Sequence, residues 1–90
     1  MKKAKSPIRV GQAVFVRTVT YHYTGRIIAV TDCEIVLDQA AWIADSGRWA
    51  NALATGQLNE IEPYPGVISI ARGAVVDVSP WNHELPQAVR

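Results

Sequence analysis

The 90-residue sequence contains one cysteine, Cys33, and no long apolar run. A single cysteine excludes an intramolecular disulfide framework and fits a reducing compartment. No apolar segment is long enough to cross a membrane, and Lys2, Lys3 and Lys5 are followed by none of the apolar stretch that a secretory signal needs. We therefore expect a cytoplasmic protein without membrane contact, and a prokaryotic or phage-derived origin fits this expectation.

Histidine is also scarce, and the two present, His22 and His83, lie far apart in the sequence. No Cys-x-x-Cys or His-x-x-x-His pair offers ligands at metal spacing. No glycine-rich phosphate loop occurs, and no nucleophile has a base near it in sequence. We therefore predict a protein that is not an enzyme, with neither a cofactor nor a metal.

Basic residues are few outside the first segment. The formal net charge is +1, but all three lysines fall within the first five residues. We interpret residues 1–10 as a flexible basic tail. From Ser6 onward six arginines face eight acidic residues, so the remaining chain is slightly acidic. A nucleic-acid-binding domain normally clusters Lys and Arg on one face, so this balance disfavours nucleic acid as a partner.

Short stretches rich in β-branched and aromatic residues predict strands. In the third stretch Cys33, Ile35 and Leu37 fall on one face and Glu34, Val36 and Asp38 on the other, an alternation that indicates a half-buried strand. The first has no cleanly polar face, so we expect cover on both sides. The five predicted strands are 13–21, 23–30, 33–39, 67–71 and 74–79, with a hinge at Arg72-Gly73.

A different pattern follows the third strand. Within about 45–56, Trp49 and Leu53 recur on one helical face, and Gly56 can end a helix of two to three turns. Asp45 or Ser46 is the expected N-cap. Such a short amphipathic helix must dock, and the expected site is the barrel mouth lined by Val14, Ile35 and Leu37.

These elements predict an all-β fold. The expected architecture is a small, five-stranded, strongly bent barrel over 11–80, with the helical insert between strands three and four and a tail at 81–90. Trp81, after the terminating Pro80, is expected to pack against its own or a neighbouring barrel.

Two segments resemble the motifs of the Sm-like family, whose small barrels are close in form to SH3-like barrels. Residues 23–38 place Gly25 early in a strand, followed by alternating apolar residues and an Asp32 turn, as the first Sm motif does. Residues 68–80 run an apolar strand into Arg72-Gly73 and then a second apolar strand, which is similar to the second motif. The resemblance implies a ring of about five to eight copies joined by edge strands, often with RNA on its inner rim.

The RNA-binding loop of the family is matched less well. The turn Asp32-Cys33-Glu34 is one residue shorter and lacks the usual asparagine, and Glu34 would repel phosphate. Arg72 either meets a phosphate or base in a pore, or pairs with a carboxylate such as Asp77 or Asp38. The run Tyr21, His22 and Tyr23 either stacks on bases or packs across strands.

The sequence thus favours a non-catalytic, homo-oligomeric Sm-like module of about five to seven subunits that scaffolds or binds a macromolecular partner such as another protein. The alternative is a ring of Sm type that binds RNA or single-stranded nucleic acid through Arg72 and the Tyr21–Tyr23 region. The predicted subunit interface comprises Ile68, Ile70, Val76, Val78 and Trp81.

Overall fold

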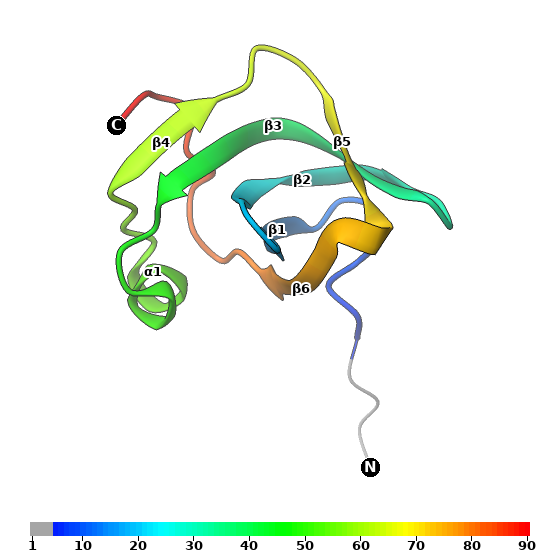
Figure 1. Ribbon diagram of the computed structural model, residues 1–90, viewed down its shortest axis with the longest axis horizontal. Helices are drawn as coiled ribbons and strands as arrows, with labels where there is room; N and C mark the ends of the chain where they lie inside the picture. The colour runs from blue at the N-terminus through cyan, green and yellow to red at the C-terminus, as the bar shows by residue number, and fades with distance from the viewer. Residues whose placement is uncertain (1–4) are drawn as a thin grey trace.

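Strands dominate the computed structural model, which describes residues 5–90, and the predicted all-β class with one short helix is confirmed: 48% of residues lie in strands and 12% in helices. The helix lies between the third and fourth strands, as predicted. In chain order the elements are β1 (Ala13–Thr18), β2 (His22–Val30), β3 (Glu34–Asp45), α1 (Trp49–Thr55), β4 (Glu60–Pro63), β5 (Ile68–Ala71), the 3-10 turn η1 (Arg72–Ala74) and β6 (Val75–Pro80) (Figure 1).

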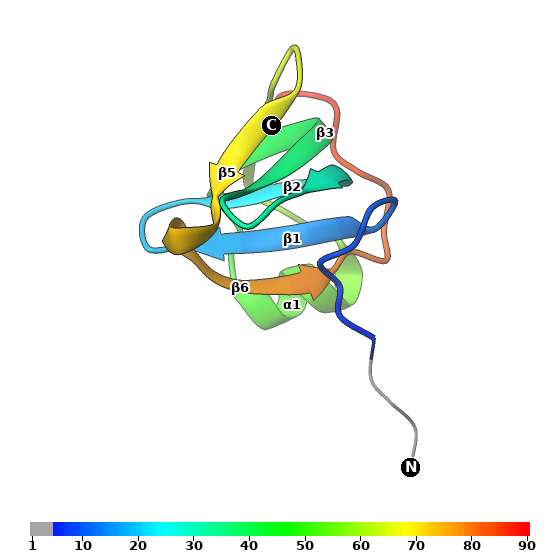
Figure 2. The same cartoon turned by 90° about the vertical axis from the view of Figure 1, so that its right-hand side faces the viewer.

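One antiparallel sheet contains all six strands, in the order β4-β3-β2-β1-β6, with β5 paired to β3. The long strand β3 therefore has β2 along one side, while β5 and β4 share its other side, β5 at Glu34–Leu37 and β4 at Ala41–Asp45. At η1 the chain leaves β5 and enters β6, which pairs with β1 (Figure 2). The prediction of five strands is wrong by one, and the sheet curves without closing into a barrel.

The sixth strand, β4, finds a partner because β3 extends beyond the predicted strand 33–39. The predicted third strand ends at Gln39, where the backbone adopts a positive φ of 50°. Instead of turning into a helix there, the chain bends and continues as a strand to Asp45. The extension Ala40–Ala44 pairs with β2, and its outer edge accepts β4, a segment that lies outside the five predicted strands.

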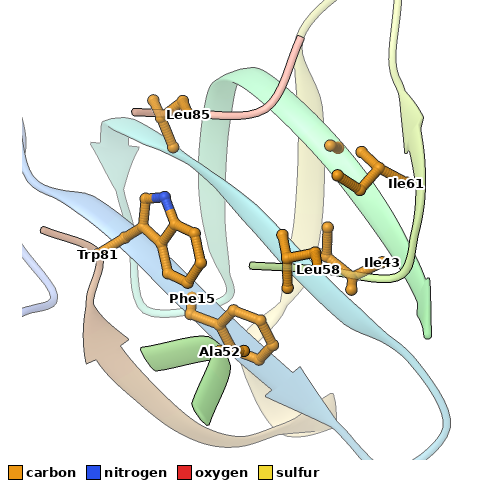
Figure 3. Close-up of a cluster of buried hydrophobic side chains, with 8 residues drawn as sticks. Phe15, Ile43, Ala52, Leu58, Ile61, Trp81 and Leu85 are labelled. Atoms are coloured by element: carbon orange, nitrogen blue, oxygen red, sulfur yellow. The ribbon is translucent and has the colours of Figure 1, made fainter. Parts of the chain in front are cut away.

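Two hydrophobic cores lie on opposite faces of the sheet, and β1 contributes to both. Val14 and Val16 are buried in a core on the face that the sheet encloses, whereas Phe15 is buried on the other face. This confirms the expected cover on both sides of the first strand. The enclosed core comprises Val14, Val16, Ile27, Ile35, Leu37, Ala40 and Ile70. The outer core comprises Phe15, Ala41, Ile43, Ala52, Leu58, Ile61, Trp81 and Leu85 (Figure 3).

Helix α1 covers the outer core. Trp49 and Leu53 pack against it, so the predicted apolar face does dock, but not on Val14, Ile35 and Leu37, which belong to the opposite face. The predicted caps at Asp45 or Ser46 are also wrong: the N-cap is Arg48 and makes no side-chain cap hydrogen bond. Asp45 is the last residue of β3, and its carboxylate accepts a hydrogen bond from the amide of Gly47 at 2.8 Å. Gly56 ends the helix in the left-handed conformation, as predicted.

The segments flanking the sheet pack against it. Ile8 contacts the enclosed core, while the predicted tail residues Lys2 and Lys3 lie outside the described residues. After β6, Trp81 and Leu85 are buried in the outer core, and Arg90 exchanges two backbone hydrogen bonds with Ile61 at 2.9 and 3.0 Å. Within residues 5–90 no helix has the length and apolar character needed to cross a membrane.

Candidate functional site

Four aromatic rings gather on the enclosed face of the sheet, next to the opening that incomplete closure leaves. Tyr23 on β2 lies directly opposite Trp42 on β3, so both side chains project from the same face. Tyr21 crosses Trp42 edge-on, with ring centroids 5.6 Å apart and planes at 83°. Tyr64 stacks on Tyr23 with centroids 6.4 Å apart and planes at 29°. We call these four residues the aromatic box.

Hydrogen bonds of the backbone hold the two exposed members of the box in place. In the turn before β2, the Thr18 hydroxyl donates to the Tyr21 carbonyl at 2.7 Å and accepts from the Tyr21 amide at 2.9 Å. Beyond β4, the Tyr64 amide donates to the Ala40 carbonyl at 2.9 Å. Tyr21 and Tyr64 nevertheless remain 50% and 37% exposed, so their rings are available to a ligand.

The box borders two connected hollows. A cavity of about 250 Å³ is lined by the four aromatic residues alone. A groove of about 420 Å³ shares Tyr21, Tyr23 and Tyr64 with that cavity and continues along β5 to the η1 turn. Its remaining lining residues are Thr18, Thr20, Ile68, Ser69, Ile70, Ala71 and Ala74, and we call it the β5 groove.

No lining residue of either hollow carries a charge. Two carboxylates lie next to the lining: Glu34 accepts a hydrogen bond from the Ser69 hydroxyl at 2.6 Å, and Glu62 lies directly opposite Trp42. Arg72, between the lining residues Ala71 and Ala74, donates to the Thr31 carbonyl. Burial, with the neighbouring Tyr64 and Tyr21, raises the pKa of Tyr23, so its phenol stays protonated at neutral pH. The site therefore offers π faces, hydroxyls and nearby carboxylates.

The predicted residues Tyr21 and Tyr23 meet in this site, but His22 and Arg72 do not join them. His22 projects from the opposite face of β2, where its ring contacts Phe15 at a centroid distance of 5.4 Å. Arg72 donates to the Thr31 carbonyl at 3.0 Å, which directs it toward the turn between β2 and β3. The four residues proposed from the sequence therefore form no single contact surface.

Asp77, suggested as a partner of Arg72, pairs with Arg17 instead. Arg17 Nε lies 2.9 and 3.1 Å from the two carboxylate oxygens of Asp77, and Nη2 donates to the same carboxylate. These hydrogen bonds lower the pKa of Asp77 and raise that of Arg17. The guanidinium carbon of Arg17 also lies 4.1 Å from the ring centroid of Trp49, so the ion pair ties β1 and β6 to the helix.

No family model, no curated protein sequence and no solved structure matches this chain. The resemblance to Sm-like proteins therefore stays a prediction.

The predicted interface residues follow β5 and β6, and among residues 5–90 each of these strands pairs on one side only. Ile70 and Trp81 are buried within the cores of a single copy, and Ile68 and Val78 are partly buried against the enclosed core. Val76 is 59% exposed. Of this set, Val76 presents the most apolar surface to a second molecule.

The direction of the β5 amides follows from one hydrogen bond. The Arg72 amide donates to the Cys33 carbonyl at 2.9 Å, in register with the β3–β5 ladder. Hydrogen-bonded pairs alternate along an antiparallel ladder. The amides of Ile68 and Ile70 therefore face β3, and those of Ser69 and Ala71 face the open edge.

Sequence reasoning missed Trp42 and Tyr64. Trp42 lies beyond the predicted third strand, and Tyr64 lies between Pro63 and Pro65, outside every predicted strand and the predicted helix. Only the continuation of β3 brings Trp42 opposite Tyr23. Across residues 5–90 the structure contains no group of three or more His, Cys, Asp or Glu side chains that could hold a metal ion.

Proposed function

We propose that this protein is a non-catalytic module that assembles with copies of itself through the open edges of β5 and β6 and presents its aromatic box to a macromolecular partner. The observation that carries the proposal is that both strands pair on one side only. An unpaired edge presents a row of free N–H and C=O groups, which is a template for strand pairing with another chain.

The two edges suit a repeating contact between different surfaces. β5 is joined to β6 by η1, yet β5 pairs with β3 and β6 with β1, so the open edges belong to opposite ends of the sheet. Pairing β5 of one copy with β6 of the next uses each edge once, and such a head-to-tail contact generates a ring when the rotation closes. We propose about five to seven copies, within the range of about five to eight that the sequence resemblance implies.

A non-catalytic role agrees with the surroundings of the reactive side chains. Cys33 is exposed in the turn before β3, away from both histidines. His83 Nε2 lies 2.7 Å from the Leu53 carbonyl oxygen at the end of α1, and His22 packs on Phe15. Both histidines border the outer core, His22 at Phe15 and His83 at Trp81, whereas Cys33 lies in the turn between β2 and β3.

A single-stranded nucleic acid is the second candidate partner. The observation that favours it is the set of aromatic rings along the β5 groove, because bases stack on such rings without sequence preference. The uncharged lining and the nearby Glu34 and Glu62 count against it, since phosphate contacts supply most of the affinity in such complexes.

The experiment is a native mass measurement by light scattering at micromolar concentration, together with the absorbance ratio of protein purified without nuclease. We expect a single species of about five to seven subunits and an absorbance ratio typical of pure protein. A monomeric mass would refute assembly. Co-purified nucleic acid would reverse the order of the two candidate partners.

A further inference from the structure

The aromatic box has the composition of a site for an organic cation. A cation is attracted to the face of an aromatic ring, most strongly to tryptophan, when it lies within about 6 Å of the ring centroid. Tyr21 and Trp42 meet at 83°, so they form two walls of a corner, and the stacked Tyr23 and Tyr64 extend it. All four rings border one cavity, so a single bound group can contact several of them.

The surrounding charges select a cation over an anion. The box contains no Lys, Arg or His that would repel a positive ligand or attract a phosphate. Cross-strand neighbours project from the same sheet face, so the Glu62 carboxylate lies on the same face as Trp42. A carboxylate beside an aromatic wall adds attraction for a cation and repels an anion.

The size of the cavity limits the ligand to a small group. Its volume of about 250 Å³ lies below the range of roughly 300–1,000 Å³ typical of pockets for whole drug-sized ligands. Its walls are aromatic carbon and phenol, which cannot replace the many hydrogen bonds that a bare ammonium makes with water. A methylated ammonium is weakly hydrated and presents apolar methyl groups, so it suits such walls better.

We infer that the aromatic box binds a methylated ammonium group. Two sources share this chemistry: a free quaternary ammonium compound such as choline, and a methylated lysine side chain of a peptide. The β5 groove also continues from the box past Thr18 and Thr20, so a peptide finds a path for its backbone there that does not use the β5 amides. The box itself contains no residue of β5 or β6, so this inference stands or falls independently of self-assembly.

The test is a titration of the full chain, followed by the indole cross-peaks of its three tryptophans in proton–nitrogen correlation spectra. The ligands are choline, an uncharged analogue in which a tert-butyl group replaces the trimethylammonium group of choline, and a peptide whose one charged side chain is a trimethyl-lysine. We expect choline or the peptide to move the Trp42 signal to saturation. The uncharged analogue should bind roughly tenfold more weakly, because it keeps the shape and loses the charge.

Variants at the exposed rim provide matched controls. Tyr64→Leu and Tyr21→Leu remove a π face from a half-exposed position and should weaken binding several-fold, whereas Tyr64→Phe keeps the ring and should bind within about twofold of the wild type. Tighter binding of the peptide than of choline, with shifts at Thr18 and Thr20, would identify a side chain as the source. Tighter binding of choline would identify a free compound.

Two results would overturn the inference. One is equal binding of choline and the uncharged analogue, since the box would then be an ordinary apolar hollow. The other is no saturable shift at Trp42 with either charged ligand. Light scattering on the same samples reports the assembly state separately.

Discussion

The imidazole of His83 lies directly against Gly56, the residue that ends helix α1. A Cβ atom placed on Gly56 would lie 2.7 Å from Cγ of His83 and 2.9 Å from its Cβ, closer than such atoms approach in proteins. His83 Nε2 also lies 2.7 Å from the Leu53 carbonyl oxygen in the last turn of the helix. The segment after β6 thus fixes the end of α1, and only glycine leaves room for it.

This contact predicts a large effect of Gly56→Ala. The φ of 78° at Gly56 costs a non-glycine residue about 1–2 kcal/mol, and the overlap with His83 adds to that. We expect urea unfolding to show a loss above about 2 kcal/mol. In a His83→Ala background the overlap is gone, so the same substitution should cost only the about 1–2 kcal/mol that the positive φ imposes. Gly66→Ala is the control, because a Cβ there meets nothing within 4 Å and its φ is not positive; an equal loss at both glycines would refute the explanation.

Self-assembly can be tested at the outward-facing amide of Ser69. Proline removes this donor while the amides that bond β3, those of Ile68 and Ile70, remain. We expect the Ser69→Pro variant to have the native mass of a monomer instead of that of the oligomer. Its far-ultraviolet circular dichroism spectrum should be unchanged. Ser69→Ala removes the hydrogen bond to Glu34 and keeps the amide, so it should assemble normally. Oligomeric Ser69→Pro would exclude this edge from the interface.

Local patterns in the sequence predicted the elements that depend on them. The alternation of Ile35 and Leu37 and the Gly56 stop were confirmed, because adjacent residues determine both. The continuation of β3 through Ala40–Ala44 was not predicted, since alanine has little preference for strands unless distant strands pair with it. Here β2 and β4 pair with the segment from both sides, and this tertiary contact outweighs the local preference. The aromatic box depends on the same contact, so half of it could not be predicted from spacing.

His22 should make stability depend on pH below neutrality. Burial lowers the pKa of His22 from its usual 6.5, and the charge of Arg17 lowers it further, outweighing the opposite effect of Asp77. The unfolded chain therefore takes up the proton first as the pH falls. We expect stability to be constant above about pH 6.5 and to decline between that pH and the lower folded pKa. His22→Gln should flatten the slope of unfolding free energy between pH 7 and 5, and an unchanged slope would contradict this assignment.

Binding of nucleic acid should be weak. The uncharged groove and the engagement of Arg72 with Thr31 leave few groups to neutralise phosphates. In fluorescence anisotropy with labelled uridine-rich and adenine-rich oligomers, we expect little binding at physiological salt and no change in Arg72→Ala. Tight binding that falls steeply with salt and is lost in Arg72→Ala would establish the RNA-binding alternative instead.

Trp49 provides a test of how helix α1 is attached. Its ring packs on the outer core on one side and meets the guanidinium of Arg17 on the other. Because the side chain is only partly buried, we expect Trp49→Ala to cost about 2–3 kcal/mol, below the range for a fully buried tryptophan. Trp49→Phe should lose much less, since it keeps a ring for both contacts and removes a buried indole N–H that has no hydrogen-bond partner. Urea unfolding measures both. If Trp49→Ala unfolds at the same urea concentration as the wild type, this ring does not hold α1. Trp49 would then belong with the residues available to a partner.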